Sequence, residues 1–254
     1  MPELTYPTIL LVLGILGFSG LVHGTLGLGF PMTATPLLAL FTDVQTAILI
    51  TLFPTIAVNI LSIIRGGNWS ESIGRYWPLA LFAAIGSIIG TEVLIFSIPE
   101  PFKLLLALLI LLYLNMHRIG RLKLGWIANH RNVAMAVFGL VAGFMAGTVN
   151  VMVPILVMFS LELGLAMTAM IQVFNLCFLA GKVSQVGVFS LQGMLGMDLL
   201  VSVLPGVAIS IAALFLGMAI RDRIDTEVYR RVLRYLLMVS AVILIIQFST
   251  DILS

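Results

Sequence analysis

Ten apolar runs follow one another along the 254-residue chain, separated by short polar stretches. They fall at residues 7–26, 31–41, 44–64, 75–96 and 100–115, and again at 132–147, 151–161, 164–189, 197–220 and 226–248. Several are about 20 residues long, the length of helix that crosses a hydrocarbon core of about 30 Å. The pattern predicts an all-α polytopic membrane protein with five helical segments in each half.

The second segment of each half is too short to cross a membrane. Residues 31–41 and 151–161 would each rise only about 16 Å as a helix. We therefore expect the first two segments of each half to form a re-entrant hairpin, whose exposed backbone is satisfied by protein or a water-filled cavity. The other three segments of each half are expected to span.

Composition supports a membrane location. Apolar residues make up 61% of the chain and charged residues 9%, against about 25% charged in soluble domains. The lipid bilayer is the expected surroundings, and the runs are too long for strands of a membrane barrel. Cys177 is the single cysteine, which excludes an internal disulfide and a Cys-based metal site. We expect no cofactor, no bound metal and no nucleic-acid partner, and a first segment retained rather than cleaved as a signal peptide.

The basic residues predict the topology. Of the 13 Lys and Arg, only Lys103 and Lys182 lie outside the stretches 65–75, 116–131 and 220–234. Basic loops stay in the cytoplasm, so these three stretches are expected inside and both termini outside. Each half then crosses the membrane an odd number of times. This predicts two inverted-topology repeats, 1–115 and 132–254, joined by a basic cytoplasmic linker, 116–131.

Two glycine-rich stretches, beginning at Gly20 and Gly139, resemble each other at an offset of about 118 residues. Gly-broken segments at matching positions of two halves indicate a transporter's binding site. The helix N-terminus after each break carries a partial positive charge and free N–H groups, which suit a small anion. Asn150 is expected to cap the second return helix or to offer its amide to the ligand. The alternative is that the glycines only allow close helix packing. The expected binding residues here are Gly27, Leu28, Gly29, Phe30, Gly147, Thr148, Val149 and Asn150.

Polar residues inside the spans extend the candidate site. Asn59 lies on a polar stripe of one segment, and Gln172, Asn175 and Lys182 on one of another. Lys182 would lie about 12 Å deep, where a charge is costly and indicates function, here as the counter-charge of an anion. Its alternative is snorkelling to the interface, and the amides have the alternative of joining helices.

One histidine lies just before the first break. His23 is a candidate for proton coupling, because the pKa of free imidazole is near physiological pH. The alternative is a hydrogen-bonded structural histidine.

A glycine cluster followed by proline occurs once in each half, on Gly24, Gly27, Gly29 and Pro36, then on Gly143, Gly147 and Pro154. With the polar stretch 172–185 and the basic linker, the chain resembles the sulfite exporter TauE/SafE family of permeases over nearly its whole length. The resemblance implies secondary transport of small sulfur-containing anions (sulfite, thiosulfate or short organosulfonates such as sulfoacetate) by alternating access. It also implies a bacterial inner membrane, with export as the expected direction. The family often has three consecutive glycines at each tip, whereas here side chains enter both.

Other functions remain open at this point. The chain could carry another small anion or a metal cation, although no carboxylate cluster lines the spans. A non-transporting scaffold is a further alternative. An intramembrane enzyme has little support, because two of the three histidines, His117 and His130, lie in the linker. We expect no enzymatic activity, and a homodimer is a candidate assembly.

Overall fold

The computed structural model describes residues 6–67, 69–116, 125–223 and 226–253. Over these residues the chain is helical, and seven helices are long and apolar enough to cross a membrane. They are α1 (Tyr6–Leu26), α3 (Val44–Gly66), α4 (Trp69–Phe96), α8 (Arg131–Val149), α10 (Met167–Leu191), α11 (Met197–Ile220) and α12 (Thr226–Leu253). The expected all-α membrane protein is confirmed at this level. The expectation for individual runs differs from the structure: the run 100–115, expected to span, forms a helix of only 15 residues that is not among the seven. The first run of each half, expected to dip into the membrane, forms a helix of spanning length. The shorter elements are α2 (Phe30–Ala39), α5 (Glu100–Leu114), α7 (Trp126–Asn129), α9 (Val153–Glu162) and η1 (Arg221–Arg223). The expected linker, 116–131, lies largely outside the described residues.

The two short helices α2 and α9 begin in the same way. Each has ten residues, or about 15 Å of rise. Pro31 lies in the first turn of α2 and Pro154 in the first turn of α9, where a missing N–H costs nothing. Proline thus sets the start of both short helices.

The helices recur at a constant spacing along the chain. From Leu26 to Val149, from Phe30 to Val153 and from Val44 to Met167 the distance is 123 residues in each case (149 minus 26, for example). This spacing differs by five residues from the offset of about 118 suggested by the glycine stretches. It matches Pro31, and not Pro36, with Pro154.

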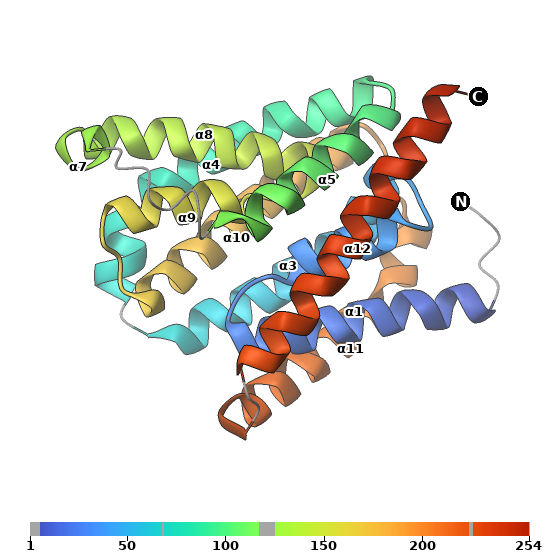
Figure 1. Ribbon diagram of the computed structural model, residues 1–254, viewed down its shortest axis with the longest axis horizontal. Coiled ribbons are helices and arrows are strands. Elements are labelled where there is room, and N and C mark those ends of the chain that lie inside the picture. The colour runs from blue at the N-terminus through green and yellow to red at the C-terminus, as the bar shows by residue number, and fades with distance from the viewer. Residues whose placement is uncertain (1–5, 68, 117–124, 224–225, 254) are drawn as a thin grey trace.

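The helices of the two halves interleave. α1 packs along α11, α4 packs along both α8 and α10, α3 packs along α10, and α5 packs along α12. Each of these pairs joins a helix from before the linker to one from after it. Figure 1 shows the result as one bundle with a shared interior.

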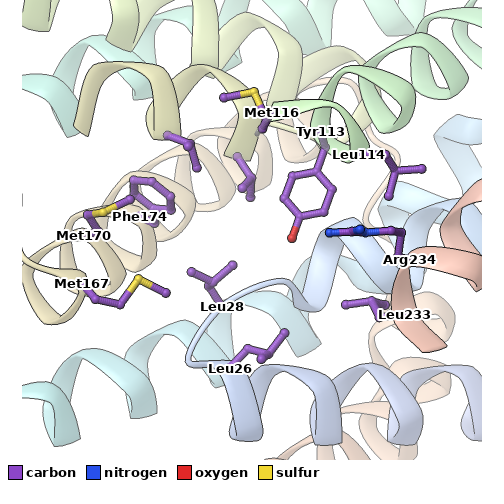
Figure 2. A pocket seen from close by; sticks show the side chains of 12 residues that line it. Leu26, Leu28, Tyr113, Leu114, Met116, Met167, Met170, Phe174, Leu233 and Arg234 are labelled. Carbon is purple, nitrogen blue, oxygen red and sulfur yellow. The ribbon is translucent and has the colours of Figure 1, made fainter. Parts of the chain in front are cut away.

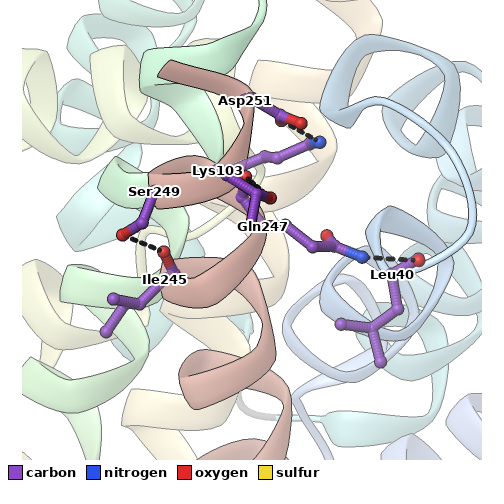
Figure 3. A network of polar contacts seen from close by, with 7 residues as sticks. Leu40, Lys103, Ile245, Gln247, Ser249 and Asp251 are labelled. Carbon is purple, nitrogen blue, oxygen red and sulfur yellow. Dashed lines mark hydrogen bonds and ion pairs between the residues drawn. The ribbon is translucent and has the colours of Figure 1, made fainter. Parts of the chain in front are cut away.

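The bundle has two chemically different ends. At one end Arg131 donates to the backbone oxygen of Arg75 (3.4 Å), and Arg65 contacts Met218. At the other end Lys103 pairs with Asp251 at 2.7 Å, and Gln247 of α12 donates to the backbone oxygen of Leu40 at 3.0 Å (Figure 3). The start of α1 and the end of α12 lie toward this second end, and α7 lies at the first, which we call the Arg-rich end (Figure 1).

Four glycines form two equivalent helix seams. Gly20 and Gly24 of α1 face α11, and a Cβ on Gly20 would lie 2.5 Å from the backbone oxygen of Ser210. Gly143 and Gly147 of α8 face α4, and a Cβ on Gly147 would lie 2.5 Å from the backbone oxygen of Ser87. The second pair follows the first by 123 residues. The packing alternative therefore accounts for Gly24, Gly143 and Gly147, because only glycine lets these backbones approach so closely.

We expect Gly143→Ala to destabilise the protein, because its Cβ would collide with the backbone oxygen of Ala83 on α4. Overpacking of this kind costs about 1–3 kcal/mol. Thermal unfolding of the purified protein in detergent measures the effect. The control is Gly14→Ala, since a Cβ on Gly14 has no atom within 4 Å. Equal melting temperatures for the two variants would contradict the seam.

Candidate functional site

The chain breaks between α1 and α2 and between α8 and α9 have matching backbone geometry. Gly27 (φ 79°) and Asn150 (φ 62°) are both left-handed, a conformation open to glycine and tolerated by asparagine. Their N–H groups donate to the backbone oxygens of His23 (2.7 Å) and Ala146 (3.0 Å). The second break therefore covers residues 150–152, and Gly147, Thr148 and Val149 lie in the last turn of α8.

Gly29 and Phe30 complete the first break. Gly29 has a φ of 105° and directly precedes α2, which begins at Phe30. A Cβ on Gly29 would meet only Val22, at 3.8 Å. Backbone conformation, and not close packing, is therefore what requires glycine at this position.

Asn150 connects the second break to the first half of the chain. Its amide nitrogen donates to the hydroxyls of Thr35 (2.7 Å) and Thr51 (3.2 Å), and its amide oxygen is buried without a partner among the described residues. The prediction that Asn150 caps the return helix is wrong, because Met152 holds the N-cap of α9. Asn150 instead ends α8 as its left-handed C-cap.

The two amides of α10 connect helices, as the structural alternative expected. Asn175 donates to the backbone oxygen of Gly27 at 2.9 Å, which fixes the first break to α10. Gln172 donates to the backbone oxygens of Ile63 (3.3 Å) and Gly67 (3.0 Å), at the end of α3. Each amide keeps a buried oxygen without a partner among the described residues.

His23 is buried, and both of its ring nitrogens are engaged. The N–H of Phe30 lies 3.4 Å from Nδ1, and the hydroxyl of Ser62 lies 2.9 Å from Nε2. A backbone N–H can only donate, so Nδ1 is the acceptor and the ring proton resides on Nε2. These contacts hold His23 against Ser62 and the first turn of α2, and a part in proton coupling stays a prediction.

Lys182 is buried in the middle of α10, with 1% of its surface exposed. Its ammonium donates to the amide oxygen of Gln185, and the Gln185 amide nitrogen donates to the backbone oxygen of Gly147 at 3.2 Å. The snorkelling alternative is therefore wrong. Among the described residues, the ion pair is the one between Lys103 and Asp251. No described carboxylate neutralises Lys182. A buried cation in this state suits an anionic ligand.

Asn59 occupies the position of α3 that matches Lys182 of α10, 123 residues earlier. It has no exposed surface, and neither amide atom has a partner among the described residues. The hydroxyl of Thr55, one turn away on α3, is also buried and unpaired within that set. Buried polar groups normally have partners, so these groups have hydrogen-bonding capacity left for a ligand.

A cavity of about 300 Å³ lies between the two breaks and the Arg-rich end. Figure 2 shows the guanidinium of Arg234 beside the hydroxyl of Tyr113. Its walls are otherwise apolar and come from five helices, the first break and Met116 just after α5: Leu26, Leu28, Tyr113, Leu114, Met116, Val153, Val157, Met167, Met170, Phe174, Leu233 and Arg234. Phe174 is eight residues from Lys182, or about 12 Å along α10.

Of the expected binding residues, Leu28 is the one among these lining residues. Sequence reasoning missed Arg234 and Tyr113, which lie within the first turns of α12 and the last turn of α5. Arg234 had been counted only as a charge of a basic loop. The signal that could have pointed to Tyr113 is that it is the one tyrosine in the apolar run 100–115.

Seven membrane-length helices among the described residues define a polytopic membrane protein. The sequence matches the model of the family "Sulfite exporter TauE/SafE" over residues 11–244, and the chain belongs to this family. It is thus a member of a family of membrane transporters. No curated protein and no solved structure gives a match.

The left-handed C-cap at Asn150 gives a testable order of stability. Asn150→Gly removes the bonds to Thr35 and Thr51 but allows the positive φ, whereas Asn150→Ala also strains the backbone by about 1–2 kcal/mol. Thermal unfolding should therefore rank the parent above the Gly variant, and the Gly variant above the Ala variant. An Ala variant as stable as the Gly variant would contradict the strained cap.

Proposed function

We propose that this protein is a secondary transporter of small sulfur-containing anions, namely sulfite, thiosulfate or short organosulfonates, and that it exports them by alternating access. The observation that carries the proposal is Lys182, a buried lysine whose Nζ contacts, among the described residues, the neutral amide of Gln185 and no carboxylate. Family membership supplies the substrate class. An anion that enters beside Lys182 provides the missing counter-charge.

The anion site is proposed to lie where α3 and α10 cross, within reach of both breaks. An anion at this depth loses its water and must regain hydrogen bonds from groups already in place. Lys182 supplies the charge, Asn59 a free amide, and the first turns of α2 and α9 supply backbone dipoles. Each break also adjoins the C-terminal end of α1 or α8, whose partial negative charge repels an anion. Lys182 is therefore needed to offset this repulsion.

The alternating-access part of the proposal rests on an inverted repeat of residues 1–115 and 132–254. Three observations support it. Helix boundaries recur every 123 residues, and the α1–α11 seam has its counterpart in the α8–α4 seam. Each break is also held by the third helix of the other half, Gly27 by Asn175 and Asn150 by Thr51. Two equivalent halves can exchange conformations, which opens the site first to one side and then to the other.

The Arg-rich end is proposed to face the cytoplasm of a bacterial cell, with both chain ends outside the inner membrane. Arg65, Arg75, Arg131 and Arg234 support this orientation through the positive-inside rule. Arg118, Arg121 and Lys123 of the expected linker lie outside the described residues. In this orientation the 300 Å³ cavity faces the cytoplasm.

A metal-cation permease has less support. The described residues contain no group of three or more His, Cys, Asp or Glu that could hold a metal ion. Lys182 would also repel a cation at the crossing of α3 and α10. The same charge favours every small anion, so the choice of sulfur anions rests on the family.

Lys182→Met should weaken sulfite binding at least tenfold, because hydrogen bonds to charged groups contribute about 1.5–3 kcal/mol. Without ligand, the variant should melt at the same temperature as the parent or higher, since a buried cation has been removed. Exchange of radiolabelled sulfite in proteoliposomes and ligand-dependent thermal shifts measure the two effects. Lys182→Arg should retain part of the exchange.

Lys103→Met is the matched control, because Lys103 lies at the opposite end of α5 from the cavity and pairs with Asp251. It should exchange sulfite like the parent. Normal exchange by Lys182→Met would remove the central support of the proposed function.

Orientation is tested by cysteine labelling in intact cells with a membrane-impermeant maleimide. Gly125→Cys, before α7, and Ser97→Cys, between α4 and α5, place thiols at exposed positions of opposite ends. Native Cys177 is buried and gives little background. Ser97→Cys should react from outside, and Gly125→Cys only after the cells are opened. The reverse pattern would overturn the orientation.

A further inference from the structure

We propose that a second cavity at the Arg-rich end binds the phosphate group of an anionic membrane phospholipid. This cavity has a volume of about 650 Å³ and lies between the starts of α4, α8 and α10 and the turn 163–166. Arg75 of α4 and Arg131 of α8 would hold the phosphate. The inference concerns a contact with the bilayer, so it goes beyond the proposed transport function and does not depend on it.

Arg131 is held in place and still has bonding capacity. Its guanidinium lies over the ring of Tyr76, 4.7 Å from the centroid, and donates to the backbone oxygen of Arg75 at 3.4 Å. Its Nε is buried without a partner among the described residues. Buried polar groups normally have partners, so this guanidinium lacks an acceptor. A phosphate supplies one, because its oxygens match the planar fork of an arginine.

The charges of the second cavity favour a single negative charge. Arg75 and Arg131 line it with one carboxylate, that of Glu71, and no ion pair joins these side chains in the described part of the chain. Glu71 lies in the first turn of α4, where the helix dipole stabilises a carboxylate. The start of α10 adds backbone N–H groups, because Ala166 and Ala169 line the cavity and no side chain caps this helix. Two cations and one anion leave one net positive charge, which matches the one negative charge of a phosphodiester.

The tryptophans place the second cavity at the depth of lipid head groups. The chain has three, Trp69, Trp77 and Trp126, and all three are exposed. Trp69 and Trp77 lie on α4 before and after Arg75, and Trp126 begins α7 at the same Arg-rich end. Tryptophan is enriched where a membrane protein meets the head groups, and basic pockets between helices bind such head groups. A lipid phosphate is therefore the anion most readily available to this cavity.

Occupation of the second cavity would connect three helices. Its walls come from α4, α8 and the start of α10, and α10 carries Lys182 farther along. A ligand that binds only the folded protein stabilises it. A bound head group should therefore hold the start of α10 against α4 and α8.

Tryptophan fluorescence tests the site directly, because every tryptophan of the chain lies at this end. The full-length protein is reconstituted into phosphatidylcholine vesicles that contain a minor fraction of brominated phosphatidylglycerol or, in parallel, of brominated phosphatidylcholine. Bromine quenches tryptophan only at close range. A hydrogen bond to a charged group changes affinity about tenfold or more. Brominated phosphatidylglycerol should therefore quench as strongly as at least a tenfold larger fraction of brominated phosphatidylcholine.

Two variants assign this preference to the second cavity. Arg131→Gln should remove most of it, but this change also removes the contact with Tyr76. Arg75 is exposed and in no ion pair among the described residues, so Arg75→Gln should remove the preference and leave the fold unchanged. The matched control is Arg65→Gln, an exposed arginine of the same end that lies over Phe215 and outside the lining. It should keep the preference of the parent.

Three results would overturn the inference. The first is equal quenching by the two brominated lipids. The second is an equal loss in Arg65→Gln and Arg75→Gln, because the attraction is then that of a diffuse basic surface. The third is displacement of brominated phosphatidylglycerol by millimolar inorganic phosphate or by an equal amount of phosphatidylethanolamine, because the site then takes a soluble anion or needs no net charge.

Sulfite exchange in the same vesicles separates this inference from the proposed function. Absence of exchange by the parent, with its lipid preference intact, contradicts the proposed function and leaves the lipid site standing. Exchange by a parent that shows no lipid preference contradicts the lipid site alone.

Discussion

Helix breaks inside a membrane expose backbone groups that water cannot reach, and the rest of this structure depends on how those groups are satisfied. At the first break the oxygen of Gly27 receives the amide of Asn175, and the N–H of Phe30 lies against His23. At the second break the Asn150 backbone closes onto α8. Several residues that the sequence suggested as ligand contacts thus serve as hydrogen-bond partners of backbone groups at the breaks. The ligand is left with the groups that remain unpaired.

Two contacts at the breaks, of Asn175 with Gly27 and of Thr51 with Asn150, join opposite halves, which requires the halves to approach closely. The seams of α1 with α11 and of α8 with α4 allow this, because Gly20, Gly24, Gly143 and Gly147 bring backbone against backbone. With the halves this close, α10 lies next to Gly27 and α3 lies next to Asn150. The glycines of this chain therefore have two separate tasks. Those within helices set the distance between halves, and Gly27 and Gly29 permit the positive φ of the break.

That division explains how far the sequence could predict the structure. Apolar run length predicted the helices well, because burial in lipid leaves few other conformations. The offset between halves was wrong by five residues, because matching glycine to glycine aligned Gly29 of a break with Gly147 of a seam. Glycines of a break and glycines of a seam look alike in sequence, and only the groups that they pack against distinguish them. Likewise, nothing in the sequence distinguishes Arg234 from the basic residues near it, and only the path of α12 brings it to the cavity.

Asn59 of α3 and Lys182 of α10 lie 123 residues apart, the spacing at which helix boundaries recur, and they differ in charge. Two lysines at these positions would give the interior of the bundle two uncompensated charges in a medium that screens them poorly. Two asparagines would leave no net charge to replace the hydration of an anion. One lysine, with one neutral amide at the matched position, avoids both problems.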